Sequence, residues 1–154
     1  MRIKWKDPMI VMCRTWGKDG KTAEIGALLD FNYHYCCISR GAALALGFPE
    51  GASTPSNYAA LRPDRVPTII GFRGLETGIL ITLPRVSLGP LEARNVETIV
   101  FELDLPKFLP ADMVLGNTFL KNFRLSIDYD KGYVSLQQRK STESTSGQHA
   151  LPDA

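Results

Sequence analysis

The sequence lacks any long apolar run and any strong excess of charge of one sign. No stretch of roughly 20 apolar residues occurs among its 154 residues, so no transmembrane helix is predicted. A basic start followed by an apolar run of about 7–15 residues, typical of a secretory leader, is also missing. The formal net charge is +2, and the basic cluster Arg139-Lys140 is too small to track a phosphate backbone. Neither a membrane nor a nucleic acid is expected as a partner.

Cysteine is scarce. The chain has three cysteines, an odd number, and Cys36 and Cys37 are adjacent, which is a poor geometry for a mutual disulfide. A reducing compartment, the cytoplasm, is therefore expected. His34 precedes them, but this spacing matches no structural zinc site, and the cysteines are predicted to be small buried apolar side chains. No metal and no other cofactor are expected.

Strand signals dominate what is present. Apolar segments rich in Val, Ile and Leu alternate with Gly, Pro, Asn and Asp, and the 44% hydrophobic content suits one domain with a real core. That domain is expected over residues 1–138. The tail, residues 139–154, consists mainly of Ser, Thr, Gly, Gln and Pro, and is expected to be flexible because it has little apolar surface to bury.

Turn and cap residues divide this domain into short elements. Hairpins are predicted for Met9–Arg14 with Thr22–Leu29, and for Arg124–Tyr129 with Tyr133–Gln138. Two short helices are predicted, one over Gly41–Leu46, capped by Ser39 and closed by Gly47, and one over Asn117–Asn122. The fold class is thus expected to be all-β with one or two short helices.

Two segments have the composition of loops. Residues 48–67 are rich in Pro, Gly, Ser and Asn, which predicts an irregular surface loop. Between the β-like segments Val66–Phe72 and Gly78–Leu83, the stretch Gly71–Gly78 is predicted to be a glycine-rich tip that can bend and open. Such a tip is also typical of an ordinary hairpin turn.

The most informative feature is a pair of apolar strand ends. Leu28-Leu29 leads into Asp30, and about eighty residues later Met113-Val114-Leu115 leads into Gly116. The first strand delivers a carboxylate to a loop. An Asp that merely ends a strand and forms a turn is the ordinary alternative.

Taken in order along the chain, these features resemble the retropepsin-like aspartic protease domain. The resemblance covers roughly residues 9–138. It consists of an opening hairpin, an apolar strand ending in Asp, a short segment ending in Leu-Gly, a glycine-tipped flap, a hydrophobic-hydrophobic-Gly motif and a closing hairpin. The resemblance implies a single-lobe closed β-barrel that forms a homodimer.

The resemblance also implies a mechanism and a site. Two carboxylates about 3 Å apart cannot both ionise, so one stays protonated while the other activates water. A single lobe supplies one of them, so Asp30 of each subunit would form a catalytic dyad in a two-fold dimer. The substrate would be a peptide or protein. The expected substrate-binding residues are Phe31, Asn32, Tyr33, Gly71, Phe72, Arg73 and Gly74.

The triplet departs from the family pattern, which is Asp-Thr-Gly where this chain has Asp30-Phe31-Asn32. Phe31 has no hydroxyl to tie the two active-site loops together across the dimer. Asn32 is tolerated at positive φ and is also able to donate a hydrogen bond to Asp30. The alternative to an endopeptidase is an inactive relative that binds peptides or dimerises, and an unrelated small-molecule-binding barrel is a more remote one. Tyr33, with the adjacent His34 and Tyr35, is expected either to line a groove or to pack the loop.

Overall fold

The computed structural model describes residues 1–48, 68–71, 74–101 and 111–139. At 68–71, 74–78 and 101 it describes the backbone alone. This part of the chain forms ten strands and two short helices. The strands are β1 (Arg2–Lys4), β2 (Ile10–Trp16), β3 (Thr22–Leu29), β4 (Cys36–Ile38), β5 (Thr68–Gly71), β6 (Gly74–Leu88), β7 (Leu91–Phe101), β8 (Met113–Leu115), β9 (Phe123–Asp128) and β10 (Tyr133–Gln138). The helices are α1 (Arg40–Ala45) and α3 (Asn117–Leu120), and one 3-10 turn covers Lys18–Gly20. The all-β class is confirmed.

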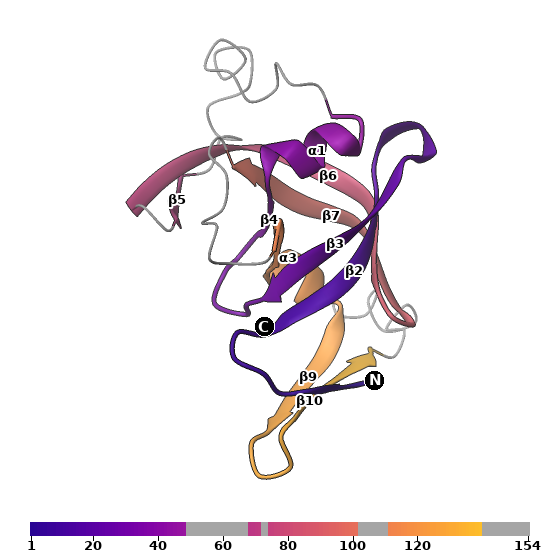
Figure 1. Ribbon diagram of the computed structural model, residues 1–154, viewed down its shortest axis with the longest axis vertical. Helices are drawn as coiled ribbons and strands as arrows, with labels where there is room; N and C mark the ends of the chain where they lie inside the picture. Colours follow the sequence, from indigo (N-terminus) through magenta and orange to yellow (C-terminus); the bar gives the residue numbers. More distant parts are fainter. Residues whose placement is uncertain (49–67, 72–73, 102–110, 140–154) are drawn as a thin grey trace, which may run out of the picture.

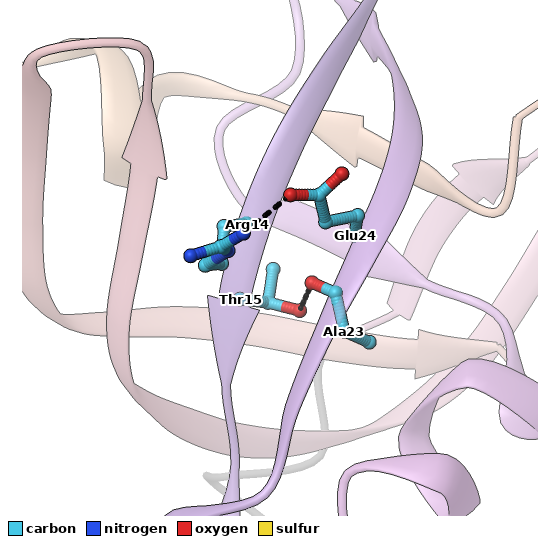
Figure 2. A network of polar contacts seen from close by, with 4 residues as sticks. All are labelled: Arg14, Thr15, Ala23 and Glu24. Atoms are coloured by element: carbon cyan, nitrogen blue, oxygen red, sulfur yellow. Dashed lines mark hydrogen bonds and ion pairs between the residues drawn. The ribbon is translucent and has the colours of Figure 1, made fainter.

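β2 and β3 form the opening hairpin that their turn residues predict. Along β2, every second side chain is buried while Met12 and Arg14 are exposed. Figure 2 shows how polar groups are paired here: Arg14 lies 2.6 Å from the Glu24 carboxylate, and the Thr15 hydroxyl donates to the Ala23 carbonyl oxygen at 3.2 Å. The exposed ion pair contributes little to stability. The hydrogen bond matters more, because Thr15 is fully buried.

Six strands close into a barrel. Their order is β2-β3-β8-β4-β7-β6, and β2 pairs with β6 to complete the circle. Figure 1 shows the long β6–β7 hairpin curving from the upper left of the view to the lower right. Most neighbours are antiparallel, but β3 with β8 and β4 with β7 are parallel. Parallel neighbours end at the same edge of a sheet, so the loops that follow β3 and β8 start side by side.

A separate three-stranded sheet, β1-β10-β9, lies below the barrel (Figure 1). Ile3, Val134 and Ile127 form one cross-strand row of this sheet and pack against the barrel core. The next row includes Arg2 and points to the opposite face, because successive side chains of a strand alternate. The sheet therefore covers the lower end of the core with its apolar face.

Both predicted helices are present. The Ser39 hydroxyl accepts a hydrogen bond from the Ala42 N–H at 3.2 Å and caps α1, and Gly47 follows the helix with a φ of 88°. α3 starts directly after Gly116 and ends at Leu120, two residues earlier than expected. Among the described residues, no helix is long and apolar enough to cross a membrane.

The expected eight-residue flap tip was wrong in its extent. Gly71 pairs with Gly74, and β6 then continues without a break to Leu88. Residues 75–77 each face a partner in β5, so backbone pairing outweighs the conformational freedom that the glycines offer. The remaining tip, Phe72-Arg73, lies outside the described residues, as do the predicted loop from position 49 to 67 and the tail from position 140 onward.

Candidate active-site loop

Asp30 and Gly116 are neighbours because the strands before them are paired. In the parallel register, Leu28 faces Val114 and Leu29 faces Leu115. The Asp30 N–H continues this ladder by donating to the Leu115 carbonyl oxygen at 3.1 Å. The two apolar strand ends noted in the sequence therefore form one structural unit.

Gly116 is required by the close approach of two backbones. A Cβ atom at this position would lie 2.1 Å from the Tyr35 carbonyl oxygen and 2.9 Å from that of Tyr33. The following residues bind the same segment: Asn117 N–H donates to the Tyr33 carbonyl oxygen at 2.8 Å, and Thr118 N–H donates to that of His34 at 2.9 Å. The loop after β8 thus holds the loop after β3 through its backbone.

Thr118 is a supporting residue that the sequence did not reveal. Its buried hydroxyl accepts from the Cys36 N–H at 2.9 Å and donates to the Glu97 carbonyl oxygen at 2.7 Å. It therefore joins α3 to β4 and β7. A threonine at the start of a short helix gives no signal of such a role in a single sequence.

Asp30 is partly buried, and one of its oxygens is already bonded within the loop. Asn32 N–H donates to Asp30 Oδ1 at 2.9 Å, and Tyr33 N–H makes a longer contact of 3.4 Å with the Asp30 carbonyl oxygen. No bond to Asp30 Oδ2 occurs in the described part of the chain.

Asn32 donates the expected hydrogen bond to Asp30, but its backbone is not left-handed. Among the described non-glycine residues, positive φ occurs only at Asp19 and Asn95, so Asn32 does not occupy a left-handed position. The donor to Asp30 is its backbone N–H, and the exposed side chain is not needed for that bond. A turn closed by an aspartate side chain two residues earlier places this N–H without left-handed backbone.

Phe31 and the neighbouring tyrosines differ in burial. Phe31 is 45% exposed. Tyr33 and Tyr35 are partly buried and pack against a small cluster of Cys37, Ile99 and Val114. Both tyrosines thus pack within the structure, and the expected role of Tyr33 in binding a substrate stays a prediction. His34 is exposed, with its ring edge-on to Tyr35 at 4.6 Å.

A hollow of about 200 Å³ lies beside this loop. Its lining includes Leu29 and Phe31 from the end of β3, residues 5–9, and Ile127 and Val134 from the three-stranded sheet. A larger groove of about 480 Å³ lies between β2 and the β6–β7 turn, but it shares no lining residue with the Asp30 loop. Of these two, the smaller hollow is the one lined by a residue of the Asp30 loop, Phe31.

The flap residues are only partly described. Gly71 and Gly74 end β5 and begin β6 as a paired couple, while Phe72 and Arg73 lie outside the described residues. The expected role of these four residues in binding a substrate stays a prediction.

All three cysteines are buried, as the sequence predicts, and none of them forms a disulfide. Burial raises the pKa of Cys13 to about 12, with a smaller contribution from Cys36. Burial also raises the pKa of Cys36, against hydrogen bonds from Thr118 and two backbone groups. Both thiols therefore stay protonated at neutral pH. Within the described ranges, no group of three His, Cys, Asp or Glu side chains is placed to hold a metal ion.

No protein-family model and no curated protein matches the sequence. Among solved structures, a retropepsin-like aspartic protease from Rickettsia conorii is similar, with 18% identical residues, 88% of each chain covered and a TM-score of 0.56. A likeness at this level of identity concerns the fold alone, and the chemistry must be argued from the residues. The six-stranded barrel, the paired ends of β3 and β8 and this structural likeness together give the identification: the chain has a retropepsin-like fold.

Proposed function

We propose that this chain is a homodimeric aspartic endopeptidase of the retropepsin type, with a dyad formed by Asp30 of each subunit. The observation that supports the proposal is the position of Asp30 and its hydrogen bonding. It stands at the end of β3 beside Gly116, its Oδ1 accepts the Asn32 N–H, and its Oδ2 has no partner in the described residues. A carboxylate held in this way has one oxygen fixed and the other available.

In the proposed mechanism, the dyad carries one proton between two carboxylates. The ionised carboxylate takes a proton from a water molecule while that water attacks the peptide carbonyl carbon. The protonated carboxylate donates its proton to the carbonyl oxygen. The Asn32 N–H keeps Asp30 oriented in both states. The β5–β6 hairpin would close over an extended peptide. The three unbridged thiols suit a reducing compartment, and we place this activity in the cytoplasm.

Asp30→Asn tests the mechanism. Asparagine keeps the shape and an oxygen acceptor for the Asn32 N–H, but it removes the acid. Hydrolysis of a peptide library in mildly acidic solution is expected to fall by at least about a hundredfold. The matched control is Asp130→Asn, an exposed turn residue, which should cleave at the wild-type rate. Equal cleavage by Asp30→Asn and wild type would assign the activity to other residues.

A second candidate function is favoured by Phe31. An exposed aromatic ring stands where the family has a hydroxyl that joins the two loops, and an aromatic ring suits an interface better than catalysis. In this alternative the chain dimerises or binds peptides without cutting them. Peptides retained equally by the wild type and Asp30→Asn, with no cleavage by either, would favour this alternative over the endopeptidase.

A further inference from the structure

The hollow beside the Asp30 loop is surrounded by exposed aromatic side chains. Phe31 is 45% exposed and Trp5 is 37% exposed, and both line the hollow. Tyr129, 71% exposed, meets Trp5 edge to face with ring centroids 5.3 Å apart. Three of the seven large apolar side chains exposed in the described residues thus gather at one place. A concentrated apolar patch marks an interaction site, whereas isolated exposed side chains do not.

This patch has an exposed ring, Phe31, beside a hollow whose lining includes the apolar side chains of Leu29, Ile127 and Val134. A hollow of about 200 Å³ is large enough for a phenyl ring, since an apolar cavity of roughly 150 Å³ holds benzene. An interface with two-fold symmetry needs both parts on the same surface, because each copy must offer what the other receives.

The hollow has one exposed charge of each sign in its lining. Lys6 and Asp7 are adjacent, exposed and of opposite sign. A two-fold axis close to these residues would bring Lys6 of one copy towards Asp7 of the partner subunit, and the reverse pair would form at the same time. A partner of uniform charge would be attracted by one of these side chains and repelled by the other.

We propose that the partner at this patch is a second copy of the chain, held by insertion of Phe31 of each copy into the hollow of the other. The inference rests on the proposed dimeric function and adds the residue that holds the dimer. Phe31 directly follows Asp30, so the same contact places the two carboxylates near the axis. The buried Phe31 rings then hold the two active-site loops together, as a hydroxyl does in the family pattern.

Sedimentation equilibrium of wild type and Phe31→Ala tests the anchor. Burying a phenyl ring is worth about 1.5–3 kcal/mol, and the dimer has two, so Phe31→Ala should raise the dimer dissociation constant by at least about a hundredfold. The matched control is Tyr133→Ala. Tyr133 is 39% exposed and stands on the sheet face that points away from the hollow, so its truncation should leave dissociation near the wild-type value. Circular dichroism confirms that the exposed-site variants remain folded.

The outcomes separate the inference from the function on which it rests. A wild type that stays monomeric at high micromolar concentration removes both. A dimeric wild type whose Phe31→Ala variant dissociates no more than Tyr133→Ala overturns the anchor and leaves the dyad proposal standing. A selective loss with Phe31→Ala supports the anchor.

A charge exchange tests the two-fold arrangement. Lys6→Asp places two acids opposite each other in its homodimer, and Asp7→Lys places two bases opposite each other, so each should dissociate roughly tenfold more readily than wild type. Mixed together, the two variants restore both opposite-charge pairs, and their heterodimer should be as tight as the wild-type dimer. A mixture no tighter than its components overturns this arrangement.

Discussion

The loop that follows β3 and the loop that follows β8 leave the barrel side by side, but they differ in burial and in what fixes their residues. After β8, Gly116 and Thr118 are buried, and backbone contacts or hydrogen bonds to other strands dictate both. After β3, Phe31 and Asn32 are exposed, and the bond to the Asp30 side chain uses the backbone N–H of Asn32. Packing and hydrogen bonds of the fold therefore determine the residues after β8. The fold does not constrain the side chains of Phe31 and Asn32 after β3 in the same way.

This difference explains where the chain departs from the family triplet. Both changed residues, Phe31 and Asn32, are exposed in the single chain, where substitutions cost little stability. The Gly116 position, where any side chain would collide with the Tyr35 carbonyl, matches the family motif. A retropepsin-like fold therefore persists whether or not the Asp30 loop still performs its chemistry. Activity has to be tested at the exposed residues and not inferred from the framework.

Gly116→Ala should have the largest effect on stability. The new Cβ meets backbone atoms of Tyr35, which cannot move without breaking the bonds from Asn117 and Thr118, so a loss of about 3 kcal/mol or more in the free energy of unfolding is expected. The measurement is urea unfolding. Gly41→Ala is the control, because open space surrounds that helical position, and it should be neutral or stabilising by up to about 1 kcal/mol. Similar midpoints for the two variants would contradict the close approach.

Thiol alkylation should distinguish a cysteine introduced into the exposed loop after β3 from the buried native cysteines. The cysteine introduced by Asn32→Cys lies at an exposed position and is expected to have the pKa of a free thiol, so its alkylation should accelerate as pH rises through about 8.5. Burial raises the pKa of Cys13, to about 12, and that of Cys36, so these two native thiols stay protonated over that range and should react at least about a hundredfold more slowly. Mass spectrometry after timed alkylation gives both rates. Rapid labelling of Cys36 in the folded protein would show that the structure around β4, next to the loop, opens to solvent.

Thr118→Val should have an intermediate effect. Valine keeps the shape and removes the hydroxyl, which leaves the Cys36 N–H and the Glu97 carbonyl without that partner, at a cost of about 2 kcal/mol. Thr118→Ser retains the hydroxyl and should lose less than about 1 kcal/mol, the share of one buried methyl group. Unfolding by urea measures both. If serine is as harmful as valine, packing and not hydrogen bonding is what Thr118 supplies.

The same contrast shows what a single sequence can predict. The hairpins, Ser39 and the paired strand ends at Asp30 and Gly116 were predictable because each follows from local chemistry: turn glycines, a cap hydroxyl, or an apolar strand meeting a polar loop. Thr118 was not predictable, because its two partners lie on strands distant in sequence. The flap tip was predicted too long because the glycine count says nothing about which backbone groups find partners across β5.

The smallest effect is expected at Asn32, where the bond to Asp30 comes from the backbone. Asn32→Ala keeps the N–H and should change the free energy of unfolding by less than about 0.5 kcal/mol. Asn32→Pro removes the donor and should cost about 1 kcal/mol. Because proline also restricts Phe31, Asp30→Ala is included to remove the acceptor instead, and it should cost a similar amount. Urea unfolding of all three variants compares them directly. If Asn32→Ala is as costly as the other two, the side chain holds the turn, and the exposed loop is more constrained by folding than its burial indicates.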